Sequence, residues 1–158
     1  MNDKQALAEE AASKALKYEF DYGCCPQCVL AAVQETVGLV SDETIKASHA
    51  LSGGGGLSGV GLCGSLVGGI LALGAKRGRD RDKFHRGKFI GNFSKADELM
   101  KEFRERFGGL TCQELQERFT GETYDMWRPE EYQRFCDQRG DQCARTAEFV
   151  TRWVVERL

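Results

Sequence analysis

Cysteine is the residue type in this chain best suited to carry chemistry, and four of the seven cysteines stand where helices are expected to begin. A helix N-terminus carries partial positive charge and unpaired N–H groups, and both stabilise a thiolate over a thiol. The thiolate is the form that attacks a disulfide or binds a metal ion. The four residues are Cys25, Cys63, Cys112 and Cys143. If their helices converge, the chain builds one cysteine site.

The first of these cysteines also belongs to a CxxC motif, Cys25-Pro26-Gln27-Cys28. Because Pro26 suits a first helical turn, we expect Cys25 to be the most reactive thiol, with its thiolate stabilised by the helix end. Cys28 is then the partner in a reversible catalytic disulfide, although an inert core position is an equal alternative for it. No strand precedes the motif and no histidine follows it, so neither a thioredoxin setting nor covalent haem attachment is indicated.

The other three cysteines are far apart along the chain. Structural zinc sites usually draw their ligands from close pairs, which argues against a zinc finger. A helical bundle can nevertheless gather distant ligands into its interior. Taken singly, Cys63, Cys112 and Cys143 each fit a small core position; taken together with Cys25, they favour a shared site for a transition metal or an iron–sulfur cluster. Four further residues show no such pattern, with Cys24 a candidate resolving thiol: Cys24, His49, His85 and Cys136.

A glycine-rich segment precedes Cys63. Residues 59–64 match GxGxxG, but a dinucleotide fingerprint needs a preceding strand, and here more glycines precede it. We expect backbone N–H groups in this region to approach a thiolate or a cluster closely. The alternative for the glycines after Cys63 is that they only permit tight helix packing. The residues expected to contact the bound group are Gly53, Gly54, Gly55, Gly56 and Gly64.

The regular elements that must position these residues are all helical. Apolar residues recur at helical spacing, and Thr111 with Glu114 has the form of a capping box. Expected helices cover residues 3–19, 26–37, 41–51, 62–76, 94–107 with Ser94 as cap, one from 111, a short piece from 129, and 142–157. Residues 77–92 are expected to form a polar loop. No strand is evident, so we predict a compact all-α single-domain bundle of six to eight helices over residues 1–158.

Composition excludes several classes of function. A net charge of -2 argues against a general polyanion partner, so we expect no nucleic-acid binding. The uncharged stretch 47–75 is too rich in glycine for a spanning helix, so no membrane insertion is expected. Residues 1–20 include several charged residues and no apolar core, so this segment is not expected to be a signal peptide. We therefore expect a cytoplasmic protein whose cysteines are thiols or metal ligands rather than a structural disulfide framework.

Several of these features resemble a known family, the redox-active proteins named after a C_GCAxxG_C_C signature. The resemblance covers about residues 23–158 and leaves 1–22 as an N-terminal helix. Residues 25–29 resemble the first motif, and residues 63–68 resemble CGAxxG with Ser65 in place of Ala. Residues 107–115 and Cys143 resemble the third and fourth cysteine regions. The resemblance implies redox or metal chemistry at the same four cysteines, beside an oxidoreductase or another redox partner.

Together these observations indicate a redox-active cysteine protein that transfers thiol equivalents or electrons through a four-cysteine site. That site works either by dithiol–disulfide exchange or with a bound metal or iron–sulfur cluster. A non-enzymatic metal-binding or scaffold module that docks on an oxidoreductase is the second hypothesis. A plain helical domain with buried thiols is the third. The sequence leaves open whether the protein is itself an enzyme.

Overall fold

The computed structural model describes residues 2–158; Met1, with which the expected single domain begins, lies outside the described residues. These residues form eight α-helices and two short 3-10 helices, with no strand, as the all-α prediction required. The helices are α1 (Asp3–Tyr22), α2 (Cys25–Val37), α3 (Asp42–Ala47), η1 (His49–Leu51), α4 (Gly64–Arg77), η2 (Arg81–Arg86), α5 (Ile90–Phe107), α6 (Cys112–Thr120), α7 (Pro129–Arg139) and α8 (Gln142–Arg157).

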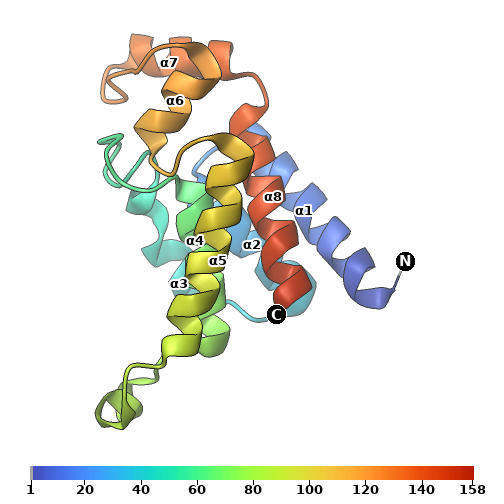
Figure 1. The fold of residues 1–158 in the computed structure, drawn as a ribbon. Helices are drawn as coiled ribbons and strands as arrows, with labels where there is room; N and C mark the ends of the chain where they lie inside the picture. The colour runs from blue at the N-terminus through green and yellow to red at the C-terminus, as the bar shows by residue number, and fades with distance from the viewer. Residues whose placement is uncertain (1) are drawn as a thin grey trace.

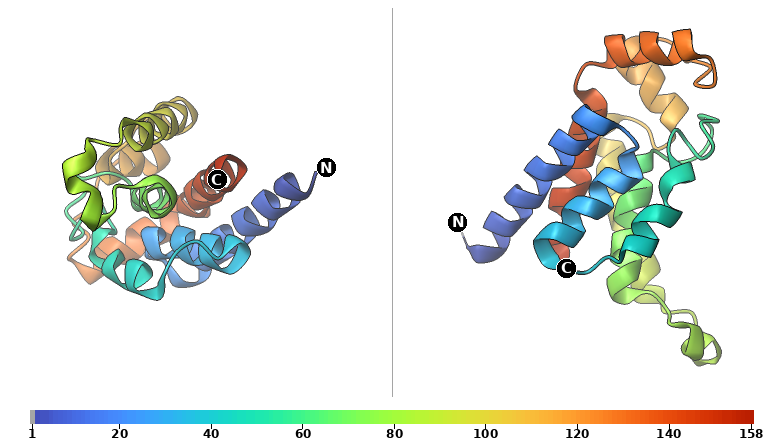
Figure 2. Two further views of the ribbon diagram at one scale, coloured as in Figure 1. Left: turned by 90° about the horizontal axis from the view of Figure 1, so that it is seen from below. Right: turned by 180° about the vertical axis from the view of Figure 1, so that it is seen from behind.

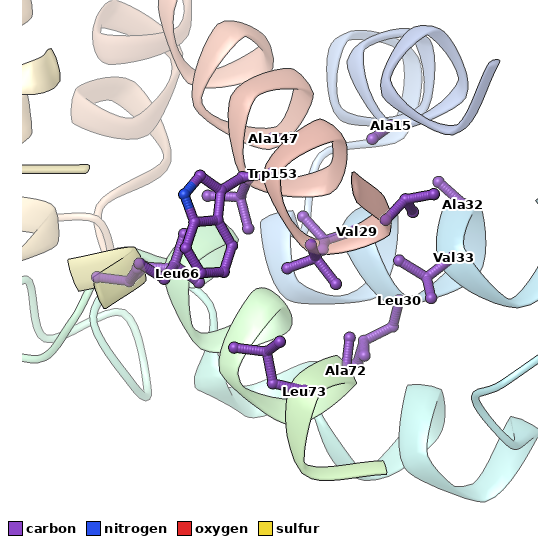
Figure 3. Packing of buried hydrophobic residues seen from close by; sticks show 14 of the residues in the cluster. Ala15, Val29, Leu30, Ala32, Val33, Leu66, Ala72, Leu73, Ala147 and Trp153 are labelled. Carbon is purple, nitrogen blue, oxygen red and sulfur yellow. The ribbon is translucent and has the colours of Figure 1, made fainter. Parts of the chain in front are cut away.

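The core lies between α1, α2, α4 and α8. α1 packs along α8 through a stripe of fully buried small residues, Ala8, Ala11, Ala12 and Ala15. Because alanine has a short side chain, the two helix axes approach closely. α2 and α4 complete the core with larger aliphatic side chains, and Figure 3 shows Val29, Leu30 and Val33 of α2 near Ala72 and Leu73 of α4. This packing fixes the relative positions of three of the four cysteine-bearing helices.

The two ends of the bundle differ. α6 and α7 lie across one end, and the segment between α4 and α5 projects from the other, as Figure 1 and the rear view in Figure 2 both show. α2, α4 and α8 all begin at the end covered by α6 and α7. No helix within residues 2–158 combines the length and the apolar composition needed to cross a bilayer.

Three expected boundaries are wrong. α5 begins at Ile90 with Phe89 as its N-cap, so Ser94 lies inside the helix and caps nothing. Residues 77–92 accordingly contain η2 and the start of α5 rather than only loop. α1 continues to Tyr22 instead of ending near residue 19, and it stops at Gly23, which adopts a positive φ of 69° and donates its N–H to the Glu19 carbonyl. The added turns are largely exposed, with Phe20, Tyr22, Ile90 and Phe93 all more than 60% exposed, so these boundaries follow the backbone rather than buried packing.

One short piece of extended backbone joins the glycine-rich loop to the start of α6. Leu62 and Thr111 form an isolated antiparallel bridge. The Cys63 N–H donates to the Leu110 carbonyl (2.7 Å), and the Cys112 N–H donates to the Gly61 carbonyl (3.0 Å). The bridge therefore sets Cys63 beside Cys112 although 48 residues of chain separate them.

Candidate functional site

The four predicted cysteines stand at four helix N-termini. Cys25 is the first residue of α2, Cys63 is the N-cap of α4, Cys112 is the first residue of α6 and Cys143 is the second residue of α8. A pocket of about 450 Å³ lies among these helix ends. Cys25, Cys112 and Cys143 line it, and Cys63 is buried next to the lining residue Gly64. The structure thus brings together residues that are up to 118 positions apart.

Close approach of α2 and α4 depends on glycine. A Cβ atom at Gly64 would lie 2.7 Å from Pro26 Cδ and 3.1 Å from Cys25 Cβ. A Cβ atom at Gly68, one turn further along, would lie 2.9 Å from the Pro26 carbonyl oxygen. The absence of side chains at these two positions lets the N-terminus of α4 sit directly on the first turn of α2, which sets Cys25 beside Cys63.

The glycine-rich loop forms part of the pocket wall. Gly53, Gly54, Gly55 and Gly56 have φ angles of 61°, 76°, 80° and 56°, a left-handed conformation that other residues rarely adopt. Gly53, Gly56 and Gly64 line the pocket, whereas Gly54 and Gly55 do not. The role of Gly54 is internal to the loop, because the Gly61 N–H donates to its carbonyl (2.9 Å).

A buried ion pair lies at the centre of the site, and the sequence reasoning missed it. Arg139 Nη1 is 2.9 Å from Glu19 Oε1, and the side chain of Glu19 is 2% exposed. The Cys25 thiol donates a hydrogen bond to the same carboxylate oxygen (Sγ to Oε1, 3.3 Å). Glu19 Oε2 and Arg139 Nε are buried with no hydrogen-bond partner among the described residues.

A sequence signal for Glu19 did exist. The buried face of α1 runs through Ala8, Ala11, Ala12 and Ala15, and position 19 continues this face at helical spacing. A carboxylate on an otherwise apolar stripe is seldom buried without a partner. That pattern could have marked Glu19 as a candidate, but nothing local to it indicates Arg139 as its partner.

Burial keeps the four thiols protonated near neutral pH. It raises the pKa of Cys63 to about 11 and that of Cys143 to about 12, with Arg139 partly opposing the shift at Cys143. Burial also raises the pKa of Cys112. The Gln116 amide donates a hydrogen bond to the Cys112 sulfur (3.4 Å), which partly lowers that pKa again. At Cys25 burial comes first and the Glu19 carboxylate second, and together they hold its pKa well above the usual value. The expected lowering of the Cys25 pKa is therefore wrong, because desolvation and a neighbouring negative charge outweigh the helix end.

The pKa of Cys25 is also affected by the other three cysteines, which indicates that the four side chains lie near one another. After burial and Glu19, the remaining causes of its rise are the thiols of Cys63, Cys143 and Cys112, in that order. Such coupling falls off with distance, so the four sulfurs share one neighbourhood.

Cys28 has the buried position that was one of its two expected alternatives, whereas Cys24 lies at the pocket. The Cys28 thiol is buried behind the pocket wall and donates to the Gly23 carbonyl (3.0 Å). Burial, then Glu19 and Cys24, raises its pKa to about 12. Cys24, the candidate resolving thiol, lines the pocket with a strained φ of 63°, and the Ser52 hydroxyl donates to its sulfur (3.1 Å).

Of the three other residues that showed no pattern in the sequence, one lines the pocket and two do not. His49 lines the pocket, and its carbonyl accepts a hydrogen bond from the Cys24 thiol (3.5 Å). His85 lies in η2 at the opposite end of the bundle. Cys136 lies outside the pocket wall beside Tyr132, whose pKa is raised to about 12 by burial and then by Cys136.

The cysteines of the site are not arranged as ligands of a single metal ion. Within residues 2–158, no group of three or more histidine, cysteine, aspartate or glutamate side chains is arranged so that it could hold a metal ion. All seven cysteines have free thiols. The arrangement is a set of converging, protonated thiols around a pocket rather than a preformed site for a single ion.

Comparison with known proteins places the chain in a family. It belongs to the C_GCAxxG_C_C family, described as "Putative redox-active protein (C_GCAxxG_C_C)", whose model matches residues 23–157. The resemblance noted in the sequence is thereby confirmed. No curated protein and no solved structure matches the chain.

Proposed function

We propose that this member of the C_GCAxxG_C_C family is an electron-transfer protein in which Cys25, Cys63, Cys112 and Cys143 ligate an iron–sulfur cluster. The observation that carries the proposal is the convergence of these four thiols, from four helix N-termini, on one pocket. Four cysteine thiolates are the usual ligand set of such clusters. When bound, the cluster supplies one-electron redox chemistry.

The chemistry of the donor set fits a cluster better than a single ion. The side chains are not arranged to hold one metal ion, whereas a cluster distributes its cysteine ligands over several iron atoms. Four buried thiolates would be costly without nearby positive charge. The four helix N-termini supply such charge, whereas the charge of Arg139 is already balanced by Glu19.

The residues around the sulfurs have roles of their own. The Gln116 amide donates to the Cys112 sulfur, and the Thr146 hydroxyl lies 3.9 Å from the Cys63 sulfur. Hydrogen bonds to ligand sulfurs raise the reduction potential of a cluster. Thr146 donates its one hydroxyl proton to the Cys143 carbonyl (2.6 Å) and lies 2.9 Å from the Ser65 hydroxyl. Of Thr146 and Gln116, it is therefore Gln116 that donates to a cysteine sulfur in this arrangement.

Dithiol–disulfide exchange is a second candidate, and one observation favours it. Glu19 accepts the Cys25 S–H, so a carboxylate stands ready to take the proton of that thiol. A Cys25–Cys28 disulfide would form as an oxidised partner disulfide takes up two electrons and two protons. The Cys28 thiol must first leave the Gly23 carbonyl, and the raised pKa values of both thiols slow the attack.

Anaerobic purification with iron and sulfide analysis tests the leading proposal. We expect iron and acid-labile sulfide, visible absorption, and loss of most of the iron in each Cys→Ser variant at positions 25, 63, 112 and 143. Cys136→Ser is the matched control and should keep its iron, because Cys136 lies outside the pocket wall.

Two other results would separate the alternatives. Failure to take up iron after anaerobic reconstitution would contradict the cluster. If mild oxidant then protects one thiol pair from alkylation and Cys25→Ser abolishes the protection, dithiol exchange is the function. With neither result, a scaffold that docks on an oxidoreductase would remain. Seven free thiols suit the reducing cytoplasm, where we propose that the redox partner is found.

A further inference from the structure

The pocket lined by Cys25, Cys112 and Cys143, here called the thiol pocket, is also lined by side chains that have no role in the proposed cluster. Aromatic side chains line it in addition to the cysteines, and a volume of about 450 Å³ is in the range of small-molecule sites. Tyr22, Trp127 and Tyr132 are exposed and form the mouth, whereas Met126 and Phe135 are buried in the wall.

Trp127 is the most unusual of them. It is 72% exposed, yet its indole Nε1 donates to the Gly56 carbonyl (3.0 Å) and its backbone N–H donates to Asp125 Oδ1 (3.1 Å). An exposed indole normally gains nothing from being fixed in one orientation. Here a bond to a residue 71 positions away holds the ring at the edge of the pocket, where it can serve as a stacking surface.

The polar groups of the pocket set the charge of an occupant. Arg139 is the one lysine or arginine in the wall formed by residues 2–158, and its guanidinium is already paired with Glu19. No unpaired cation is therefore present to hold a phosphate group. Arg139 nevertheless lines the pocket with a side chain that is 13% exposed, and only one of its guanidinium nitrogens is bonded to Glu19, so another N–H can donate to a neutral carbonyl oxygen.

We propose that the mouth of this pocket binds a flat, uncharged aromatic molecule that carries carbonyl oxygens, of the quinone class. The ring lies against Trp127 and Tyr132, and a carbonyl oxygen faces Arg139. Such a molecule is a small electron carrier, so its use in the cell rests on the proposed function, whereas its binding does not.

The chain contains two tryptophans, which provides an internal control for a fluorescence test. The probe is 2,3-dimethyl-1,4-naphthoquinone, whose substituted ring carbons do not readily add thiols. Titration of the full-length protein should quench Trp127 saturably. In Trp127→Phe the remaining Trp153 is 3% exposed in the core, and it should show only the non-saturating loss caused by absorption of light by the quinone.

Affinity is then measured by equilibrium dialysis, which does not depend on fluorescence. Trp127→Ala should weaken binding at least tenfold, whereas Phe84→Ala, a substitution at the opposite end of the bundle, should leave it unchanged. Circular dichroism of each variant verifies its fold; Trp127→Phe, which keeps a flat ring, should retain more affinity than Trp127→Ala. Equal binding by wild type and Trp127→Ala would overturn the proposal.

Parallel titrations with flavin mononucleotide and with iron-free protein separate the remaining outcomes. Tighter binding of the phosphate-bearing flavin than of the quinone would overturn the inference that the occupant is uncharged. Quinone binding to protein that fails to take up iron would support the pocket while the cluster proposal fails. Iron uptake without saturable quinone binding would overturn the pocket and leave the cluster proposal intact.

Discussion

The thiol of Cys25 donates a hydrogen bond to the carboxylate of Glu19, with Sγ 3.3 Å from Oε1. The same oxygen lies 2.9 Å from Arg139, so the first residue of α2 is linked through the end of α1 to the end of α7. This link is the electrostatic centre of the thiol pocket. The charge on Glu19 raises the pKa of Cys25, and Arg139 opposes the rise at Cys143.

Glu19→Gln should destabilise the protein by about 3–5 kcal/mol, because it leaves the largely enclosed Arg139, 13% exposed, without a countercharge. Urea denaturation followed by circular dichroism measures the loss. Glu9→Gln is the matched control in the same helix, since the Glu9–Arg152 pair is exposed and its loss should cost about 1 kcal/mol or less.

The double variant Glu19→Gln with Arg139→Met removes both charges and should recover much of the lost stability. An equal cost for Glu19→Gln and Glu9→Gln would contradict the assignment of a buried ion pair.

Gly64→Ala should disturb the site by pushing the N-termini of α2 and α4 apart, since its Cβ would lie 2.7 Å from Pro26 Cδ. We expect a cost of about 1–3 kcal/mol, measured by thermal or urea denaturation. Gly74→Ala lies in the same helix with nothing within 4 Å of the added Cβ, so it should stabilise the protein by up to about 1 kcal/mol. Opposite signs for the two variants are the diagnostic result.

The buried thiols should make the metal-free, reduced protein less stable at high pH. The pKa of Cys63 is about 11 in the folded state against 9.0 for an ordinary thiol, so between these values the folded chain keeps a proton that the unfolded chain releases. The stabilisation is present below pH 9 and is lost as the pH rises toward 11, by about 2–3 kcal/mol for this thiol.

Lysines and tyrosines titrate over the same range, so the measurement is the difference between wild type and Cys63→Ala. The fall in unfolding free energy between pH 9 and 11 should be shallower in the variant. Parallel curves for the two proteins would mean that Cys63 keeps its ordinary pKa when folded.

Gln116→Met should affect both stability and the Cys112 thiol. The Gln116 side chain is 1% exposed; its oxygen accepts the Tyr124 N–H (2.9 Å) and its amide donates to the Cys112 sulfur. Leaving the buried Tyr124 N–H without an acceptor should cost about 1–3 kcal/mol. The pKa of Cys112 should rise further, which slows its alkylation at a fixed pH.

Gln133→Met is the control for this substitution, because the bond of Gln133 to Asp137 is exposed. Its unfolding free energy should change by about 0.5 kcal/mol or less. A similar small change for Gln116→Met would show that its two hydrogen bonds do not stabilise the fold.

The sequence alone determined the helical class and the four helix starts that carry Cys25, Cys63, Cys112 and Cys143. These features are local: they depend on apolar spacing, on helix-terminating glycines and on caps such as Thr111 with Glu114, and the structure contains that capping box as expected. Boundaries without a strong cap were less accurate, as at Ser94, because α5 begins at Ile90 with no side-chain cap that the sequence could reveal.

Only the tertiary structure decided what surrounds the thiols. Glu19 and Arg139 are 120 residues apart, and no local pattern predicts that they meet beside Cys25. The direction of the Cys25 pKa was decided in the same way. A helix N-terminus favours the thiolate, but complete burial and the Glu19 charge favour the thiol more strongly, and both depend on how the whole chain packs.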